Sequence, residues 1–228
     1  MGFSRYSALP ATGLVRTGEE RATLVRRTYT LVFASVVVTT IGTWFGLSQP
    51  QVMQTVAAHP IITMLFAFAP LIMAQRARDR FPQNIGLVFL FTFVMGVMLS
   101  PVVFMMQATQ PGVVGQAGAL TLSTFGVLTL YAWISRRDFS AWGGFFVVGL
   151  WVLIGTSFLN IFFGNATSSL WIAAAGVFVF SGLLVFDTWR LRNVYGPDDY
   201  VPAAVAIYLD LLNMFMFILQ LLGGGRRS

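Results

Sequence analysis

The 228-residue chain contains no cysteine, no lysine and a single histidine, His59. Without cysteine it has no disulfide, no thiolate metal site and no cysteine nucleophile. Without lysine it cannot form a Schiff base of the kind that holds retinal. One imidazole predicts neither a zinc site nor a histidine-based catalytic relay, because such sites need further ligands or a nearby nucleophile. We therefore expect no resident cofactor. We also expect that the protein is not an enzyme, and an intramembrane hydrolase is the least favoured of the functions considered.

Charge is also scarce. Only 10% of the residues are charged and 57% are hydrophobic, with a mean hydropathy of +0.77, whereas a soluble domain carries about 25% charged residues. So few charges could not coat a soluble globule, so the sequence predicts an all-α integral membrane protein of one domain, with the lipid bilayer as its main partner. The net charge of +6 comes from arginines scattered between apolar runs, which indicates membrane orientation and no binding of nucleic acid.

Seven apolar runs are each close to the roughly 20 residues that a helix needs to cross the hydrocarbon core. Their limits are 29 to 47, 59 to 75, 84 to 106, 116 to 135, 142 to 163, 168 to 189 and 201 to 222. The second run is the weakest, since Pro60 and Pro70 bracket only a short stretch within it. No internal repeat is visible, so the inverted-repeat architecture of many transporters has no support.

The arginines alternate between successive loops. They precede the first run and follow the second, fourth and sixth, and the loops after the first, third and fifth runs have none. By the positive-inside rule, we expect a cytoplasmic amino terminus. We also expect the plasma membrane as the location, the inner membrane if the protein is bacterial. Seven spans place the carboxyl terminus outside, where Arg226 and Arg227 contradict the rule. Either a full last span tolerates two terminal charges, which we prefer, or the last segment is re-entrant.

These limits divide the chain into three parts. Residues 1 to 25 are predicted to form a flexible cytoplasmic arm that becomes helical near Glu19, residues 26 to 222 the transmembrane domain, and residues 223 to 228 a short tail. The glycine-rich stretch 112 to 118 lacks the Lys-Ser/Thr of a phosphate loop, so we interpret it as a flexible external loop. Gly42 and Gly46 have the small-xxx-small spacing and predict close helix packing inside the chain.

Asp187 and Asp210 are the only acidic residues embedded in strongly apolar segments. A carboxylate in hydrocarbon costs a few kcal/mol or more, so each is a candidate functional residue. Asp210 is predicted to lie about 12 Å into the membrane at 1.5 Å per residue, and Asp187 near the cytoplasmic end of its span. This difference in depth means that contact between them does not follow from the sequence. Asp187 could instead pair with Arg190, three residues further on.

If the two aspartates meet, they cannot both ionise cheaply and would share a proton near neutral pH. Such a pair is a proton-dependent latch, and once deprotonated it could attract Ca²⁺ as a transported or transiently bound ion. An arginine of the second loop, such as Arg78, is a natural counter-ion. Asn160 and Asn213 lie within apolar helices as possible supporting groups, although a helix-to-helix hydrogen bond of about 1 kcal/mol also accounts for them.

At these residues the chain resembles the Bax inhibitor-1 family, also called the transmembrane Bax inhibitor motif family. The similar stretches are 180 to 188 (FSGLLVFDT), 206 to 215 (AIYLDLLNMF), 160 to 162 (NIF) and 96 to 101 (GVMLSP). The resemblance implies a seven-transmembrane-helix bundle with the seventh helix central, and a pH-sensitive calcium leak. It also implies that Asp187 and Asp210 form the pH-sensing pair.

An arginine after the second span latches one aspartate in that family, and Arg78 is the best match here, with Arg76 as the alternative. The family's acid within the second span has no counterpart, because residues 59 to 75 contain neither Asp nor Glu. This departure weakens the expectation of conduction more than that of a latch. Two other hypotheses stay open. One is a regulator that binds other membrane proteins through residues 1 to 25, and the other is a proton-coupled transporter of a small solute.

Overall fold

The computed structural model describes residues 18–76 and 82–224, and within these ranges all regular structure is α-helical. The helices are α1 (Gly18–Ser48), α2 (Pro50–Ala58), α3 (Pro60–Arg76), α4 (Gln83–Thr109), α5 (Val113–Ile134), α6 (Ser140–Phe163), α7 (Ala166–Asn193) and α8 (Tyr200–Gly224). The all-α prediction is confirmed for this part of the chain.

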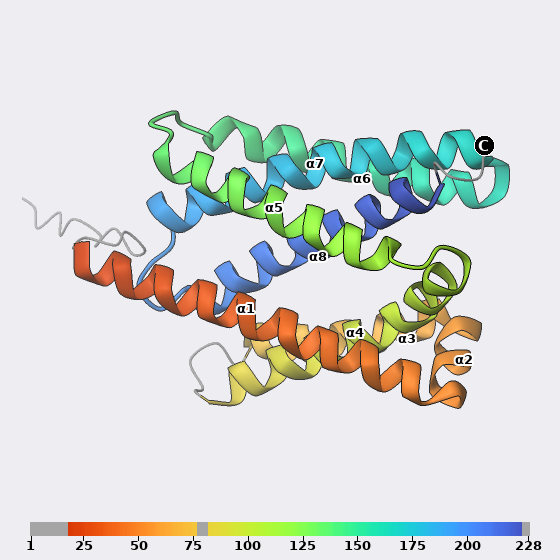
Figure 1. The fold of residues 1–228 in the computed structure, drawn as a ribbon. Helices are drawn as coiled ribbons and strands as arrows, with labels where there is room; N and C mark the ends of the chain where they lie inside the picture. The colour runs from red at the N-terminus through yellow and green to blue at the C-terminus, as the bar shows by residue number, and fades with distance from the viewer. Residues whose placement is uncertain (1–17, 77–81, 225–228) are drawn as a thin grey trace, which may run out of the picture.

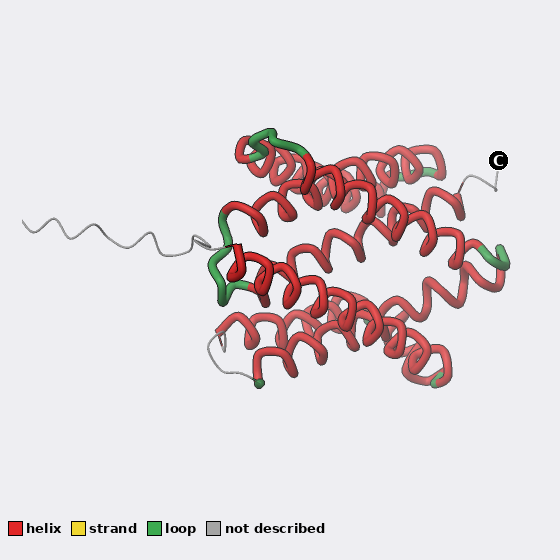
Figure 2. Tube along the Cα trace, turned by 60° about the vertical axis from the view of Figure 1, so that its left-hand side comes forward, coloured by secondary structure: helices red, strands yellow, loops and turns green. Residues whose placement is uncertain are grey.

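The helices form two groups with α8 running between them (Figures 1 and 2). One group is α1 to α4, in which α4 packs against both α1 and α3. The other is α5 to α7, in which α7 packs against both α5 and α6. The last helix contacts α7, α1, α5 and α4, and half of its most apolar window is buried, the largest share of any candidate span. Residues on α8 therefore contact both groups.

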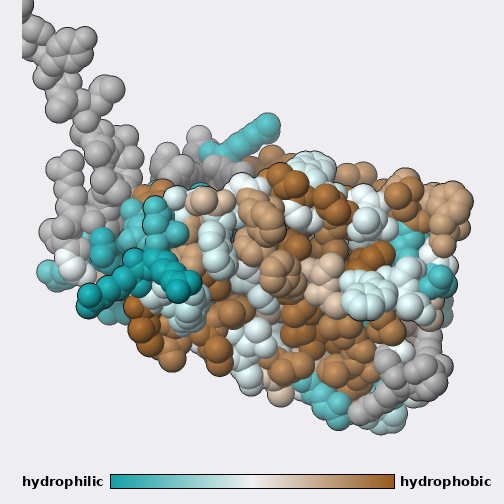
Figure 3. Space-filling view, turned by 90° about the horizontal axis from the view of Figure 1, so that it is seen from above, coloured by the Kyte–Doolittle hydropathy of each residue, from teal (hydrophilic) through white to brown (hydrophobic). Residues whose placement is uncertain are grey.

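Six helices are long and apolar enough to cross a membrane: α1, α4, α5, α6, α7 and α8. The pair α2 and α3 adds a seventh if it is one span, but its two helices are bent by 101°. Figure 3 shows hydrophobic residues spread across the middle of one face, with hydrophilic residues gathered at one end. The chain is thus a multi-pass membrane protein, and each predicted run corresponds to one helix.

The short helix α2 was not predicted. It follows Ser48 and begins at Pro50, and α3 begins at Pro60. Proline is favoured at the first turn of a helix, where its missing N–H is not needed. The two prolines therefore start two short helices in place of one continuous connection.

Close packing of α1 on α4 depends on two glycines. A Cβ at Gly42 would collide with the backbone oxygen of Phe93, and one at Gly96 with the backbone oxygen of Thr39. The close approach lets Thr43 Oγ1 donate to the carbonyl of Gly96 at 3.0 Å. The prediction that glycines of the first span pack inside the chain is confirmed.

Two predictions concern irregular segments. The predicted start of helix near Glu19 agrees with α1, which begins at Gly18; the residues before it lie outside the described part, as do Arg226 and Arg227. The predicted loop 112 to 118 is wrong, because α5 begins at Val113. Gly112 alone takes a left-handed backbone, with φ of 87°, and buried Val113 and Ala117 fix the first turns of the helix.

Candidate functional site

Helices α7 and α8 are consecutive, and residues 194–199 connect them, so their facing sides pack along much of their length. Asp187 and Asp210 lie on these facing sides and are 8% and 5% exposed. Their carboxyl groups are within hydrogen-bonding reach of each other. The structure therefore brings the two aspartates together.

The predicted difference in depth is smaller because α7 does not end at residue 189. It continues through Arg190 to Asn193, which places Asp187 about 9 Å from the end of the helix at 1.5 Å per residue. The extension is anchored by Arg192, whose Nη1 donates to the carbonyls of Trp133 and Ser135 at 2.8 and 2.9 Å. Contact between the two aspartates requires this longer α7.

Arg190 is the cation that the described residues place on this pair. Its Nη1 donates to Oδ1 of Asp187 at 3.0 Å, and its side chain is 35% exposed. The guanidinium also lies over two rings, 4.7 Å from the centroid of Tyr195 and 5.6 Å from that of Phe186. Asp187 thus contacts Arg190 and Asp210 at once, although the sequence presented these contacts as alternatives.

Tyr195 belongs to the site and was not predicted. Burial, followed by the negative charge of Asp187, raises the pKa of Tyr195 to about 12. The phenol is therefore neutral at physiological pH and presents its ring face to Arg190. Its backbone N–H donates to the carbonyl of Arg190 at 3.0 Å, which fixes the turn after α7. A lone tyrosine in a loop carries no pattern that could have marked it in the sequence.

The charges of the cluster balance only with one proton on the pair. Ionised carboxylates only accept hydrogen bonds, so the contact between Asp187 and Asp210 requires a proton. One shared proton leaves the pair at −1, which Arg190 neutralises. None of the described residues donates a hydrogen bond to the buried Oδ2 of Asp210. Loss of the proton would leave one uncompensated negative charge in a buried site, which is costly.

Only one of the two predicted latch arginines lies in the described part of the chain. Arg78 lies outside the described residues, and Arg76 is exposed at the end of α3. A latch by an arginine of the second loop stays a prediction. Among the described residues, the position of counter-ion to Asp187 is occupied by Arg190, from the same helix.

The two asparagines are not brought together with the aspartates. Asn213 Nδ2 donates to the carbonyl of Leu209 in its own helix at 2.8 Å. Asn160 lies at the other end of α7, where it donates to Ser169 Oγ at 2.8 Å and accepts from Ser168 Oγ at 2.5 Å. Its amide therefore fastens the turn between α6 and α7, and neither asparagine contacts the carboxyl pair through these bonds.

The carboxyl site offers few ligands for a tightly bound metal ion. Among the described residues, no group of three or more His, Asp or Glu side chains is placed to hold a metal ion. Ca²⁺ takes 6–8 oxygen ligands, of which Asp187 and Asp210 together supply at most four. The pair can attract a cation when both carboxyls are ionised, and the remaining ligands would have to come from water or backbone carbonyls.

Comparison with known proteins gives a consistent assignment. The family model described as "Inhibitor of apoptosis-promoting Bax1" matches residues 21–227. The chain is 31% identical to protein lifeguard 4 of Mus musculus over 205 residues, covering 89% of this chain and 85% of that protein. It is 32% identical to Bax inhibitor 1 of Schizosaccharomyces pombe over 208 residues, covering 89% and 77%.

A bacterial relative has a similar length. An uncharacterized protein of Campylobacter jejuni is 31% identical over 213 residues, which cover 89% of each chain. The family model extends from the first turn of α1 past the end of α8 and so includes both aspartates. The chain therefore belongs to the Bax inhibitor-1 family.

Proposed function

We propose that the protein is a pH-sensitive calcium leak of the plasma membrane, gated by protonation of the Asp187–Asp210 pair. The proposal includes a seven-span bundle with α8 central and a cytoplasmic amino terminus, in the inner membrane if the source is bacterial. The single observation that supports it most is the contact of two buried carboxyl groups on consecutive helices. A shared proton there links the packing of α7 on α8 to pH.

The sign of the effect follows from the charges. With one proton, the pair and Arg190 sum to zero and the carboxyl contact holds α7 against α8. As pH rises and the proton leaves, two negative charges face each other and repel, which favours separation of the helices. Flux of Ca²⁺ down its gradient should therefore increase with pH, and protonation should close the path.

The test is Ca²⁺ flux into proteoliposomes that contain an internal Ca²⁺ indicator, measured at several pH values on both sides of neutrality. Asp210→Asn replaces the ionisable group with an amide that donates to Asp187 at every pH. We expect the pH dependence of flux to be lost. Asp138→Asn is the matched control, since Asp138 is an exposed carboxylate between α5 and α6 whose Oδ1 accepts from the backbone of Ser140. An unchanged pH dependence in Asp210→Asn contradicts the proposal.

A regulator of other membrane proteins is the second candidate, and the printed names of the relatives favour it. Bax inhibitor 1 is named as an inhibitor, and the matching family model is described as an inhibitor of apoptosis-promoting Bax1. This function predicts no Ca²⁺ flux from the purified protein. Removal of residues 1 to 17, which precede α1, should then abolish the effect on a partner while leaving the helices folded.

A further inference from the structure

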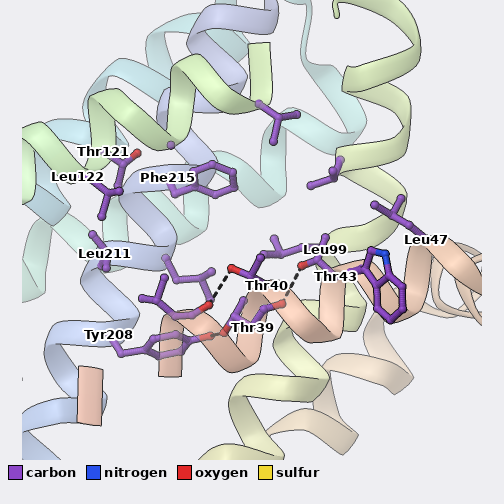
Figure 4. Close-up of a pocket in the computed structure, with 16 residues that line it drawn as sticks. Thr39, Thr40, Thr43, Leu47, Leu99, Thr121, Leu122, Tyr208, Leu211 and Phe215 are labelled. Atoms are coloured by element: carbon purple, nitrogen blue, oxygen red, sulfur yellow. Dashed lines mark hydrogen bonds between the residues drawn. The ribbon is translucent and has the colours of Figure 1, made fainter. Parts of the chain in front are cut away.

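A cavity of about 440 Å³ lies on the side of α8 that faces α1 and α5 (Figure 4). It is lined by α1, α4, α5 and α8, and its lining residues on α8 lie between Tyr208 and Phe215. On α1 they lie in the second half of the helix, and on α5 in the first half. The cavity therefore extends from the level of Asp210 toward the end of the molecule where α1 ends and α5 begins.

The cavity wall contains hydroxyl groups, but backbone carbonyls occupy them. Thr40 donates to Val36 at 2.9 Å and Thr121 to Ala117 at 2.7 Å. Thr39 Oγ1 lies 2.8 Å from the carbonyl of Ser35 and 2.7 Å from the hydroxyl of Tyr208. None of the lining residues is charged. A wall whose hydroxyls are satisfied and whose remaining atoms are apolar suits a hydrocarbon ligand and disfavours water, which needs 2–4 polar partners.

The cavity opens toward the lipid. Its lining includes Trp44 on α1 and Leu122 on α5, which are 69% and 58% exposed. Both helices are candidate membrane spans by length and composition, so we infer that these exposed side chains face lipid. The entrance between α1 and α5 is thus continuous with the lipid-facing surface.

We propose that this cavity binds one acyl chain of a membrane phospholipid, which enters between α1 and α5 and ends against α8. Its volume lies within the roughly 300–1,000 Å³ of ordinary ligand sites. The chain would contact Tyr208 and Leu211, which are only 2% and 6% exposed. Bulk lipid cannot reach these side chains unless a chain enters the cavity. The site is independent of calcium conduction, so it stands or fails separately from the proposed leak.

The experiment uses the full-length protein in vesicles that contain a phospholipid with a photoreactive diazirine on one acyl chain. After illumination, labelled positions are mapped by peptide mass spectrometry. We expect labelling within 208 to 215 of α8 as well as on the exposed face of α6, which bulk lipid contacts and which serves as the internal reference. The buried stretch 183 to 185 of α7, away from the cavity, gives the background.

Gly118 provides a substitution that fills the cavity. It lines the cavity, and a Cβ there meets nothing within 4 Å. Gly118→Leu should reduce labelling of 208 to 215 at least fivefold relative to α6, and Gly118→Ala only slightly. Gly126→Leu is the matched control, because Gly126 is also free of neighbours within 4 Å on the same helix but does not line the cavity. Glycine to leucine favours the helix at both positions, so folding should be preserved.

Two results with the phospholipid probe would overturn the proposal. One is labelling of 208 to 215 that does not exceed the background of 183 to 185 in the unsubstituted protein. The other is labelling of 208 to 215 that is equally strong in the Gly118→Leu and Gly126→Leu variants. Labelling by a photoreactive free fatty acid but not by the phospholipid probe would also contradict it, since the proposal specifies a phospholipid chain. A melting temperature measured for each variant shows whether loss of labelling reflects loss of fold.

Discussion

The two sides of α8 are both buried but differ in chemistry. The side that faces α7 carries Asp210 in contact with Asp187, with Arg190 as counter-ion. The side that faces α1 carries Tyr208 and Leu211 and borders an uncharged cavity. A charge inside a membrane bundle is tolerated only where a partner neutralises it. Among the described residues, the carboxyl pair and its counter-ion lie on the α7 side, whereas no residue that lines the cavity is charged. The two sides should therefore respond differently to pH.

Helix α8 is also hydrogen-bonded on its α1 side. Tyr208 OH lies 2.7 Å from Thr39 Oγ1, and Thr39 Oγ1 in turn donates to the carbonyl of Thr92 on α4 at 3.1 Å. This chain connects α8, α1 and α4 through neutral groups. One side of the helix is therefore held by interactions that need no charge, and the other by a contact that depends on one proton. If the carboxyl contact opens, the α1 side is the one expected to stay packed.

Removal of Arg190 should cause the largest loss of stability, and this loss should come from the contacts on the α7 side of α8. Arg190→Gln leaves the singly protonated pair at −1 without compensation. Because Arg190 is about one-third exposed, solvent screening reduces the loss below the about 3–5 kcal/mol of a fully buried pair, to about 1–3 kcal/mol. The loss should shrink as pH falls, since a second proton makes the pair neutral and Arg190 then has no charge to balance. Thermal unfolding in detergent over a pH series measures it.

The control for this experiment is Arg136→Gln. Arg136 is exposed between α5 and α6, and its substitution removes the same charge from the chain. Equal destabilisation by the two substitutions at every pH would show that net charge, and not the carboxyl cluster, is responsible.

Loss of the Tyr208 hydroxyl should have a smaller effect that does not change with pH. Tyr208→Phe keeps the buried ring and its edge contact with Phe91, 6.1 Å between centroids, and removes the hydrogen bond to Thr39. One neutral hydrogen bond contributes about 1 kcal/mol, and Thr39 keeps its backbone acceptors. The free energy of unfolding should fall by this amount equally at acid and neutral pH. A loss that varies with pH would mean that the two sides of α8 are coupled.

Hydropathy predicts the helices well because the thickness of the hydrocarbon core fixes their length. It fails where that rule does not apply. Helix α2 is only nine residues long, too short to give a membrane signal. The end of α7 was misplaced because Arg190 and Arg192 lower the local hydropathy, whereas Leu191 is fully buried and Arg192 bonds the end of α5. The contact between the aspartates depends on that extension, so it could not be derived from the sequence.

Some residues of the site could be predicted from the sequence and others could not. Asp187 and Asp210 stand out because a carboxylate in an apolar run is rare and costly. Arg190 was recognisable from its spacing of three residues on a helix. Tyr195 and the cavity have no such signal, since each depends on where separate helices pack and on which side chains leave space between them.

Tyr195 offers the smallest effect, at the alkaline end of the range. Its pKa is raised from 10.0 to about 12 in the folded protein, so the folded state holds the phenol proton more strongly than the unfolded state. The stability that this adds is complete below about pH 10 and is lost as pH rises through about 12.

Tyr195→Phe keeps the ring over Arg190, so near neutral pH its unfolding free energy should match that of the unsubstituted protein to within about 0.5–1 kcal/mol. Between the two pKa values the unsubstituted protein should lose stability relative to the variant. If the unfolding free energies of the two proteins change in parallel with pH over that interval, Tyr195 does not lie against Asp187 and Arg190. The charge cluster on the α7 side of α8 would then consist of Asp187, Asp210 and Arg190 only.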